Sequence, residues 1–242
     1  MTFKRSNGNI FLTKYAKQFV TDKILPLKNI PSEIIPHGVD QAFVNNNQKT
    51  YKNNKVTKIL YVSTIDFYKH QWQVVSAVSL LRKEGFDVEL SMIGSSYSKA
   101  LEKLNAIIKA EDPNGDFIKY KGTMDYFDLP KVYRDADIFV FASTCENLPI
   151  TLLEAMASRL PIACSKISPM PEILKDAGIY FDPYSVSSIK ESIKHLMQKP
   201  DSSNKFSEKA GLYSTKYSWK NCADKTLSFI KDTYVKIQNE QD

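Results

Sequence analysis

From residue 58 onward, short apolar runs alternate with longer amphipathic stretches, and this rhythm limits the fold more than any other feature of the chain. The runs over 59–62, 88–93 and 138–142 are almost continuously hydrophobic, as parallel strands buried on both faces are. Between them, apolar residues recur at helical spacing. The pattern predicts an α/β fold, namely a Rossmann-like doubly wound parallel sheet with helices on both faces.

The same rhythm predicts the order of the elements. Strands are expected over 59–62, 88–93, 117–120, 138–142, 162–164 and 179–181. Helices are expected over 11–25, 70–84, 97–110, 128–135, 150–158, 186–198 and 218–237, with a short strand over 34–40 and a polar linker near 45–55. Ligands of such sheets bind beyond the carboxyl ends of the strands, so a site is expected at the turns after Val62, Ile93, Tyr120 and Ala142.

Composition argues against several other classes of protein. The chain is 43% hydrophobic and 25% charged, as ordinary globular proteins are. Its longest clean apolar run, over 138–142, is far shorter than the roughly 20 residues of a membrane span, and the first 20 residues lack a signal-peptide core. Three cysteines without CxxC spacing indicate neither a disulfide framework nor a zinc site, which favours a cytoplasmic protein.

The positive charge is concentrated near the start of the chain. Residues 1–58 hold ten Lys or Arg against three acids, within a net charge of +6 for the whole chain. Such a region could lie against an anionic membrane face, or it could be a solvated surface. No basic stripe interleaved with aromatic residues accompanies it, so nucleic acid is not an expected partner.

The turn after Ala142 holds the clearest chemical signal. Glu146 is expected in the loop at the end of a strand, Pro149 in the first turn of the next helix, and Glu154 about one turn further on. The N–H groups of that first turn would suit an anion, and a carboxylate at 154 could accept from two neighbouring ribose hydroxyls. The alternative is that both glutamates only favour the helix electrostatically.

This turn resembles the Glu-x7-Glu motif of family 4 (group 1) retaining glycosyltransferases of the GT-B fold. The surrounding segments are similar to the family in the same order: Ile34 to Asp40, Val62-Ser63-Thr64 with Lys69, Ala136 to Ser143, Pro161-Ile162, Pro169 to Ile173, Asp176-Ala177-Gly178 and Phe181-Asp182-Pro183. The likeness covers about residues 30–235. It implies the donor-binding half of a GT-B enzyme that transfers a hexosyl-type group from a nucleotide-diphosphate sugar, without a metal or other cofactor.

The resemblance also assigns roles to residues of this sequence. It implies that Glu146 contacts the donor sugar, that Glu154 contacts the ribose, and that Lys69 neutralises the diphosphate. Glu146 and Lys69 are thus the catalytic candidates. The further donor contacts that it implies are the backbone amides of Asn147, Leu148 and Pro149, the loops at Gly94, Lys121 and Gly122, and the position of Thr64.

Several positions depart from the family pattern. Thr64 stands where a diphosphate-binding Arg is usual, and His70 replaces a Gly and could compensate only if it faces the phosphates. The likeness begins near the end of the family's first domain, so the acceptor-side catalytic groups are expected to be absent. Neither His37 nor His195 has a matching context. The domains are therefore expected to be a remnant over 1–45, a linker over 46–57, the donor domain over 58–215 and a helix over 216–242 that returns toward the remnant.

Other sites of chemistry are not indicated. Asp135-Ala136-Asp137 is formally a DxD, but it precedes a strand at the end away from the expected ligands, so a structural role is favoured. No cluster has metal-ligand spacing, and no Walker loop or GxGxxG occurs. Three hypotheses remain: a glycosyltransferase fragment, a subunit whose partner chain supplies the acceptor domain, and a non-catalytic nucleotide-sugar-binding module. The acceptor would be a glycan or a lipid-linked sugar, and the basic 11–25 helix would either contact a membrane peripherally or pack against the 219–237 helix.

Overall fold

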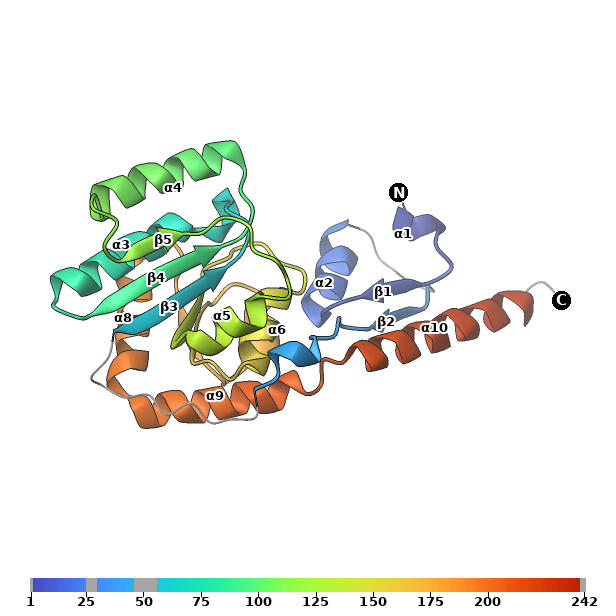
Figure 1. Ribbon diagram of the computed structural model, residues 1–242. Coiled ribbons are helices and arrows are strands. Elements are labelled where there is room, and N and C mark those ends of the chain that lie inside the picture. The colour runs from blue at the N-terminus through green and yellow to red at the C-terminus, as the bar shows by residue number, and fades with distance from the viewer. Residues whose placement is uncertain (1, 25–29, 46–55, 240–242) are drawn as a thin grey trace.

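The computed structural model describes residues 2–24, 30–45 and 56–239 (Figure 1). Its main body is a six-stranded, wholly parallel sheet in the order β5-β4-β3-β6-β7-β8, which confirms the predicted doubly wound fold. The strands are β3 (Thr57–Val62), β4 (Val88–Ile93), β5 (Ile118–Tyr120), β6 (Ile138–Phe141), β7 (Ile162–Ser165) and β8 (Ile179–Phe181).

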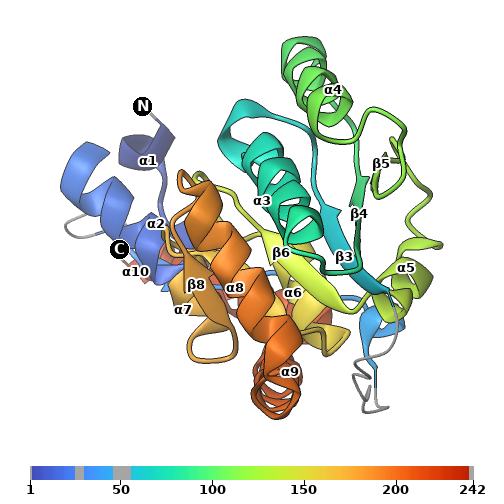
Figure 2. The same ribbon diagram turned by 90° about the vertical axis from the view of Figure 1, so that its left-hand side faces the viewer.

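Helices cover both faces of this sheet, as Figure 2 shows. On one face α3 (Gln71–Lys83) lies between α4 (Ser98–Glu111) and α8 (Val186–Gln198). On the other face lie α5 (Leu129–Asp135) and α6 (Ile150–Ala157), and α9 (Pro200–Ser214) packs against α6. The shorter elements are α7 (Met170–Leu174), the 3-10 helices η2 (Gln41–Phe43) and η3 (Phe67–Lys69), and α1 (Thr2–Arg5).

Double coverage explains the near-continuous apolar runs. All four residues of β6 are buried, because side chains on both of its faces meet a helix layer. The chain order reverses between β3 and its neighbour β6, since successive strands run outward to β5 before the chain crosses back. The crevice at this switch point, beyond the carboxyl ends of β3 and β6, is where such folds bind ligands.

The beginning of the chain differs from the predicted helix over 11–25. Phe11 ends a strand, β1 (Asn9–Phe11), which pairs in parallel with β2 (Ser32–Ile34). The helix α2 (Lys14–Phe19) starts only after Thr13, whose hydroxyl accepts from the N–H of Ala16, and it continues as a π-helical segment, η1 (Val20–Ile24). A three-residue strand gives too short a pattern to outweigh the helical spacing of the residues that follow.

The last helix, α10 (Trp219–Asn239), reaches this two-stranded sheet. The ring of Trp219 lies 5.4 Å from that of His37, and a Cβ on Gly8 would come within 3.0 Å of the Phe229 ring. α10 therefore packs against the residue just before β1 and against the segment that follows β2. α2 is instead fastened at its N-terminus to α7, because the Glu172 carboxylate accepts from the N–H groups of Lys14 and Tyr15 at 2.8 and 2.9 Å.

One long helix was not expected from the sequence. α9 follows α8 at once, with Pro200 in its first turn, where the missing N–H costs nothing. The residues that it buries are mainly small, namely Ser203, Ser207, Ala210, Gly211 and Ser214. Such a surface lacks the apolar stripe on which helix prediction depends. The predicted linker over 46–57 lies mostly outside the described residues, and Thr57 already belongs to β3.

Candidate functional site

The turn after β6 leads directly into α6. Pro149 immediately precedes the helix, with extended backbone (φ −73°, ψ 106°), and Ile150 is the first helical residue. Leu148 and Pro149 are buried and anchor the turn, whereas Asn147 is exposed. The N–H groups of the first turn of α6 therefore lie at the carboxyl end of the sheet, where they favour negative charge.

Lys69 and Glu146 come from different turns and meet as an ion pair, Nζ to Oε1. Only 10% of the Lys69 side chain and 13% of the Glu146 side chain is exposed. The ammonium group also lies over the rings of Tyr68 and Phe141, 4.9 and 5.4 Å from their centroids. Because both charges are largely withdrawn from water, a ligand that separates them must offer each one a replacement partner.

Tyr61 fixes the place of Lys69. This residue of β3 is 1% exposed, and its hydroxyl donates to the Lys69 carbonyl at 2.6 Å. The same hydroxyl accepts from the N–H of Ala142 at 3.2 Å. The turns that follow β3 and β6 are thus tied together beneath the ion pair. From sequence alone Tyr61 looked like one more apolar residue of a strand.

The turns after β3, β4 and β5 also meet closely. Gly94 has φ 144°, and a Cβ at this position would lie 2.1 Å from the Ser63 carbonyl oxygen. Its N–H donates to the Gly122 carbonyl at 2.9 Å, and Thr64 Oγ1 lies 3.0 Å from Ser95 Oγ. Gly94 and Thr64 therefore line the expected edge of the sheet. Thr64 is uncharged. The positively charged residue of these turns that pairs with Glu146 is Lys69.

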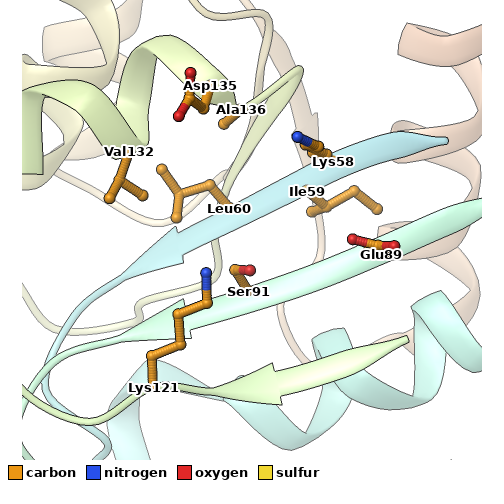
Figure 3. A pocket seen from close by; sticks show the side chains of 9 residues that line it. All are labelled: Lys58, Ile59, Leu60, Glu89, Ser91, Lys121, Val132, Asp135 and Ala136. Carbon is orange, nitrogen blue, oxygen red and sulfur yellow. The ribbon is translucent and has the colours of Figure 1, made fainter. Parts of the chain in front are cut away.

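The Lys121 side chain lies over the face of the sheet. It turns back over β4 and, with Glu89, Ser91 and Asp135, lines a depression of about 200 Å³ on the face of the sheet beside α5 (Figure 3). The ammonium group is thus directed at the sheet face rather than at the strand ends. At the edge itself, this turn offers backbone groups and Gly122, whose φ of 67° suits glycine.

Glu154 is buried deeply for a carboxylate. It lies on α6, is 3% exposed, and accepts a hydrogen bond from the Tyr133 hydroxyl at 2.8 Å. Burial raises the pKa of Glu154 to about 7, the Tyr133 hydrogen bond opposes this rise, and the nearby Asp40 adds to it. A buried carboxylate in the middle of a helix is more typical of a binding residue than of a solvated helix face. Sequence reasoning missed Tyr133, which resembled an ordinary core residue.

His70 contacts Thr144 and Tyr184. It begins α3 in the left-handed region (φ 52°), where the family usually has glycine, and its Nε2 lies 3.2 Å from Thr144 Oγ1. Its ring packs edge-on against Tyr184, with centroids 5.0 Å apart. Burial and then the charge of Lys103 lower the pKa of His70, so the ring is neutral near pH 7 and supplies no second cation.

The Asp-Ala-Asp sequence has a structural role. Asp137 Oδ2 accepts from the N–H of Lys58 at 2.9 Å, and the Asp137 N–H donates to the Lys58 carbonyl, which joins the amino ends of β3 and β6. Within the described ranges, no three His, Cys, Asp or Glu side chains are grouped as metal ligands would be. No helix in the same part of the chain is long and apolar enough to cross a membrane.

Comparison with known proteins identifies the family of the chain. Residues 43–213 match the family profile described as "Glycosyl transferases group 1". O-antigen chain mannosyltransferase B of Escherichia coli is 30% identical over 173 residues, which are 71% of this chain and 45% of that protein. O-antigen chain mannosyltransferase RfbU of Salmonella typhimurium is 23% identical over 202 residues, which are 84% of this chain and 54% of that protein.

Solved structures share the fold at lower identity. A glycosyltransferase from Rickettsia africae superposes with a TM-score of 0.80 at 19% identity, over 94% of this chain and 64% of that one. HepE of Anabaena, solved with UDP and glucose, gives 0.83 at 13% identity, over 96% of this chain and 65% of that one. The chain spans about half the length of the curated relatives that it matches. It belongs to the group 1 glycosyltransferase family and has the fold of one domain of a GT-B glycosyltransferase.

Proposed function

We propose that this chain binds the nucleotide-diphosphate sugar of a retaining hexosyltransferase that acts in the synthesis of bacterial surface polysaccharide. The observation that carries the proposal is the ion pair of Lys69 and Glu146 in the turns after β3 and β6, followed by α6 with its buried Glu154. The two O-antigen mannosyltransferases among the relatives support the polysaccharide context.

The ion pair suggests how a donor would be received. A diphosphate would offer Lys69 the negative charge that Glu146 provides in the ion pair, and sugar hydroxyls would offer Glu146 the hydrogen-bond donors that Lys69 provides there. The exchange leaves neither buried charge without a partner. As the glycosidic bond to the diphosphate breaks, negative charge grows on the leaving oxygen. Lys69 and the N–H groups at the start of α6 would stabilise that charge, and a metal ion is not required for this task.

The acceptor half would come from outside the described residues. The solved neighbours contain a third or more of their length beyond the part that matches this chain. We propose that a Rossmann-like acceptor domain, of the kind that makes up the rest of these neighbours, completes the active site and presents a glycan or a lipid-linked sugar. Transfer by this chain alone would then be slow, whereas donor binding would persist.

Peripheral contact with a membrane follows from the surface of α2 and η1. Tyr15, Phe19 and Ile24 are 37%, 47% and 48% exposed, and Lys14 and Lys23 flank them. Exposed aromatic and aliphatic side chains among lysines are typical of segments that lie in an anionic lipid interface. We propose that this surface would hold the protein near a lipid-linked acceptor on the cytoplasmic face.

A second candidate is a nucleotide-sugar-binding module without catalysis. It is favoured by Thr64, which is uncharged where the family usually has a diphosphate-binding arginine, and by His70, whose lowered pKa leaves its ring neutral. Such a module would bind the donor through Lys69 and Glu154 and would show no turnover with any acceptor domain.

Calorimetric titration of the purified chain with UDP, GDP and ADP tests donor binding. We expect one nucleotide to bind with micromolar affinity, and Lys69→Ala or Glu154→Ala to weaken it about tenfold or more, roughly 1.4 kcal/mol. Lys121→Ala removes a nearby cation whose side chain lies over the sheet face and should leave the affinity unchanged. If the folded chain bound none of the three nucleotides, or if Lys121→Ala were as damaging as Lys69→Ala, the assignment would be wrong.

A further inference from the structure

We infer that Tyr133 is a positioning residue of the donor site, which holds one oxygen of the Glu154 carboxylate and leaves the other to accept from a ribose hydroxyl. This inference rests on the proposed function, in which Glu154 receives the ribose of the donor. The relevant geometry comes from four elements, α5, α6, β6 and the segment that ends in η2.

The first step is the fixed position of the tyrosine hydroxyl. Tyr133 is fully buried, and its ring is clamped between Phe43, which meets it edge-on at 5.3 Å between centroids, and Phe139, which stacks on it at 5.6 Å. From this clamp the hydroxyl donates to Glu154 Oε2 at 2.8 Å. Because the Tyr133 ring is packed on both sides, its hydroxyl has a fixed position. The hydrogen bond from this hydroxyl therefore sets the orientation of the Glu154 carboxylate.

The second step concerns the other oxygen of the carboxylate, Oε1. Within the described part of the chain no hydrogen bond engages Glu154 Oε1, whereas Oε2 is bonded to Tyr133. A ribose hydroxyl is a single donor, and an ionised carboxylate oxygen is its best acceptor. With the tyrosine proton placed on Oε2, the lone pairs of Oε1 are free for the ligand.

The third step is electrostatic. The groups that shift the pKa of Glu154 are Tyr133 on α5 and Asp40 before η2. Glu154 in turn raises the pKa of Tyr126 in the turn before α5, and none of these three groups is a cation. Burial and Asp40 therefore disfavour the charged carboxylate, and the Tyr133 hydroxyl is the interaction that favours it. Loss of that hydroxyl would raise the pKa of Glu154 above about 7 and leave the carboxyl protonated at neutral pH.

The test is nucleotide affinity as a function of pH for the wild type, Tyr133→Phe and Tyr180→Phe. Tyr180→Phe is a matched control, because its hydroxyl donates to the Lys175 carbonyl at 2.6 Å on the edge strand β8. Calorimetry would use whichever of UDP, GDP and ADP binds the wild type best, between about pH 6 and pH 9.

We expect wild-type affinity to rise with pH through about 7, as Glu154 becomes ionised. Tyr133→Phe should bind about tenfold more weakly at neutral pH. The affinity of Tyr133→Phe should increase at a higher pH than that of the wild type, so the difference in affinity between the two should become smaller toward pH 9. The affinity of Tyr180→Phe should match that of the wild type at every pH.

Two outcomes would overturn the inference while wild-type binding stands. They are a Tyr133→Phe profile that superposes on the wild type, and one that is weaker by the same factor at every pH, which is what a merely structural defect gives. A wild-type chain that is folded and binds none of the nucleotides would instead refute the proposed function, and this inference with it.

A second measurement is the pKa of the Glu154 carboxyl, followed by carbon-detected NMR without nucleotide in the wild type and in Tyr133→Phe. An unchanged pKa in the variant would refute the electrostatic step whatever the binding data show.

Discussion

Glu154→Gln should stabilise the protein, and it should do so increasingly as the pH rises. The pKa of Glu154 is raised from an ordinary value near 4.5 to about 7, chiefly by burial. Between these values the folded chain binds more protons than the unfolded chain, so stability falls as the pH rises through this window. A shift of this size corresponds to about 3 kcal/mol of lost stability once the pH is well above 7.

Glutamine has the same shape and keeps an oxygen that accepts from Tyr133, but it has no charge to bury. The gain on substitution should therefore be small, about 1 kcal/mol, near pH 5, and about 3 kcal/mol near pH 9. Urea denaturation followed by circular dichroism at the two pH values measures it. Glu102→Gln, which neutralises an exposed carboxylate on α4, is the control and should change neither value by more than about 0.5 kcal/mol.

The reasoning would be refuted if Glu154→Gln gave the same stability change at both pH values, or destabilised the protein at pH 9. Either result would mean that the Glu154 carboxyl is ionised in the folded protein with little loss of folding stability. A stabilised Glu154→Gln that no longer binds nucleotide would show that the carboxylate is kept for the ligand at the expense of the fold.

Three further predictions concern the surrounding structure. Gly94→Ala should destabilise the protein by more than about 2 kcal/mol in urea denaturation, because φ is 144° and the new Cβ would meet the Ser63 carbonyl; a neutral result would mean that the turns do not approach so closely. Glu172→Ala should cost about 1 kcal/mol and speed hydrogen exchange at the Lys14 and Tyr15 amides, and unchanged exchange there would contradict the cap on α2. His70→Gln should leave nucleotide affinity at pH 7 within about twofold, since the ring is neutral, whereas a tenfold loss would restore His70 as a phosphate ligand.

The six-stranded sheet could be predicted from sequence because its strands are buried on both faces. β6 is apolar at every position, which leaves a signal that neighbouring polar residues do not obscure. β1 could not be predicted, since it has three residues and depends on a partner, β2, that comes 23 positions later. α9 was missed because it buries serine, alanine and glycine rather than large apolar side chains.

Some residues of the candidate site could likewise be predicted from the sequence, and others could not. Glu146, Glu154 and Lys69 were identified by resemblance, and the fold brings Lys69 and Glu146 into contact across 77 positions. Tyr61 and Tyr133 escaped notice because a tyrosine inside an apolar pattern gives no sign that its hydroxyl holds a site residue. Lys121 was assigned from its place after a strand, but backbone position does not fix where a long side chain is directed.

Chemical-shift mapping by NMR of the ¹⁵N-labelled chain, titrated with the nucleotide that binds best, tests the location of the donor site most directly. The predicted result is a set of shifted amides in the turns after β3, β4, β5 and β6 and in the first turn of α6, with β1, β2 and α10 unchanged. Shifts that gathered on β1, β2 and α10, or along the amino ends of the strands near Lys58 and Asp137, would contradict the account.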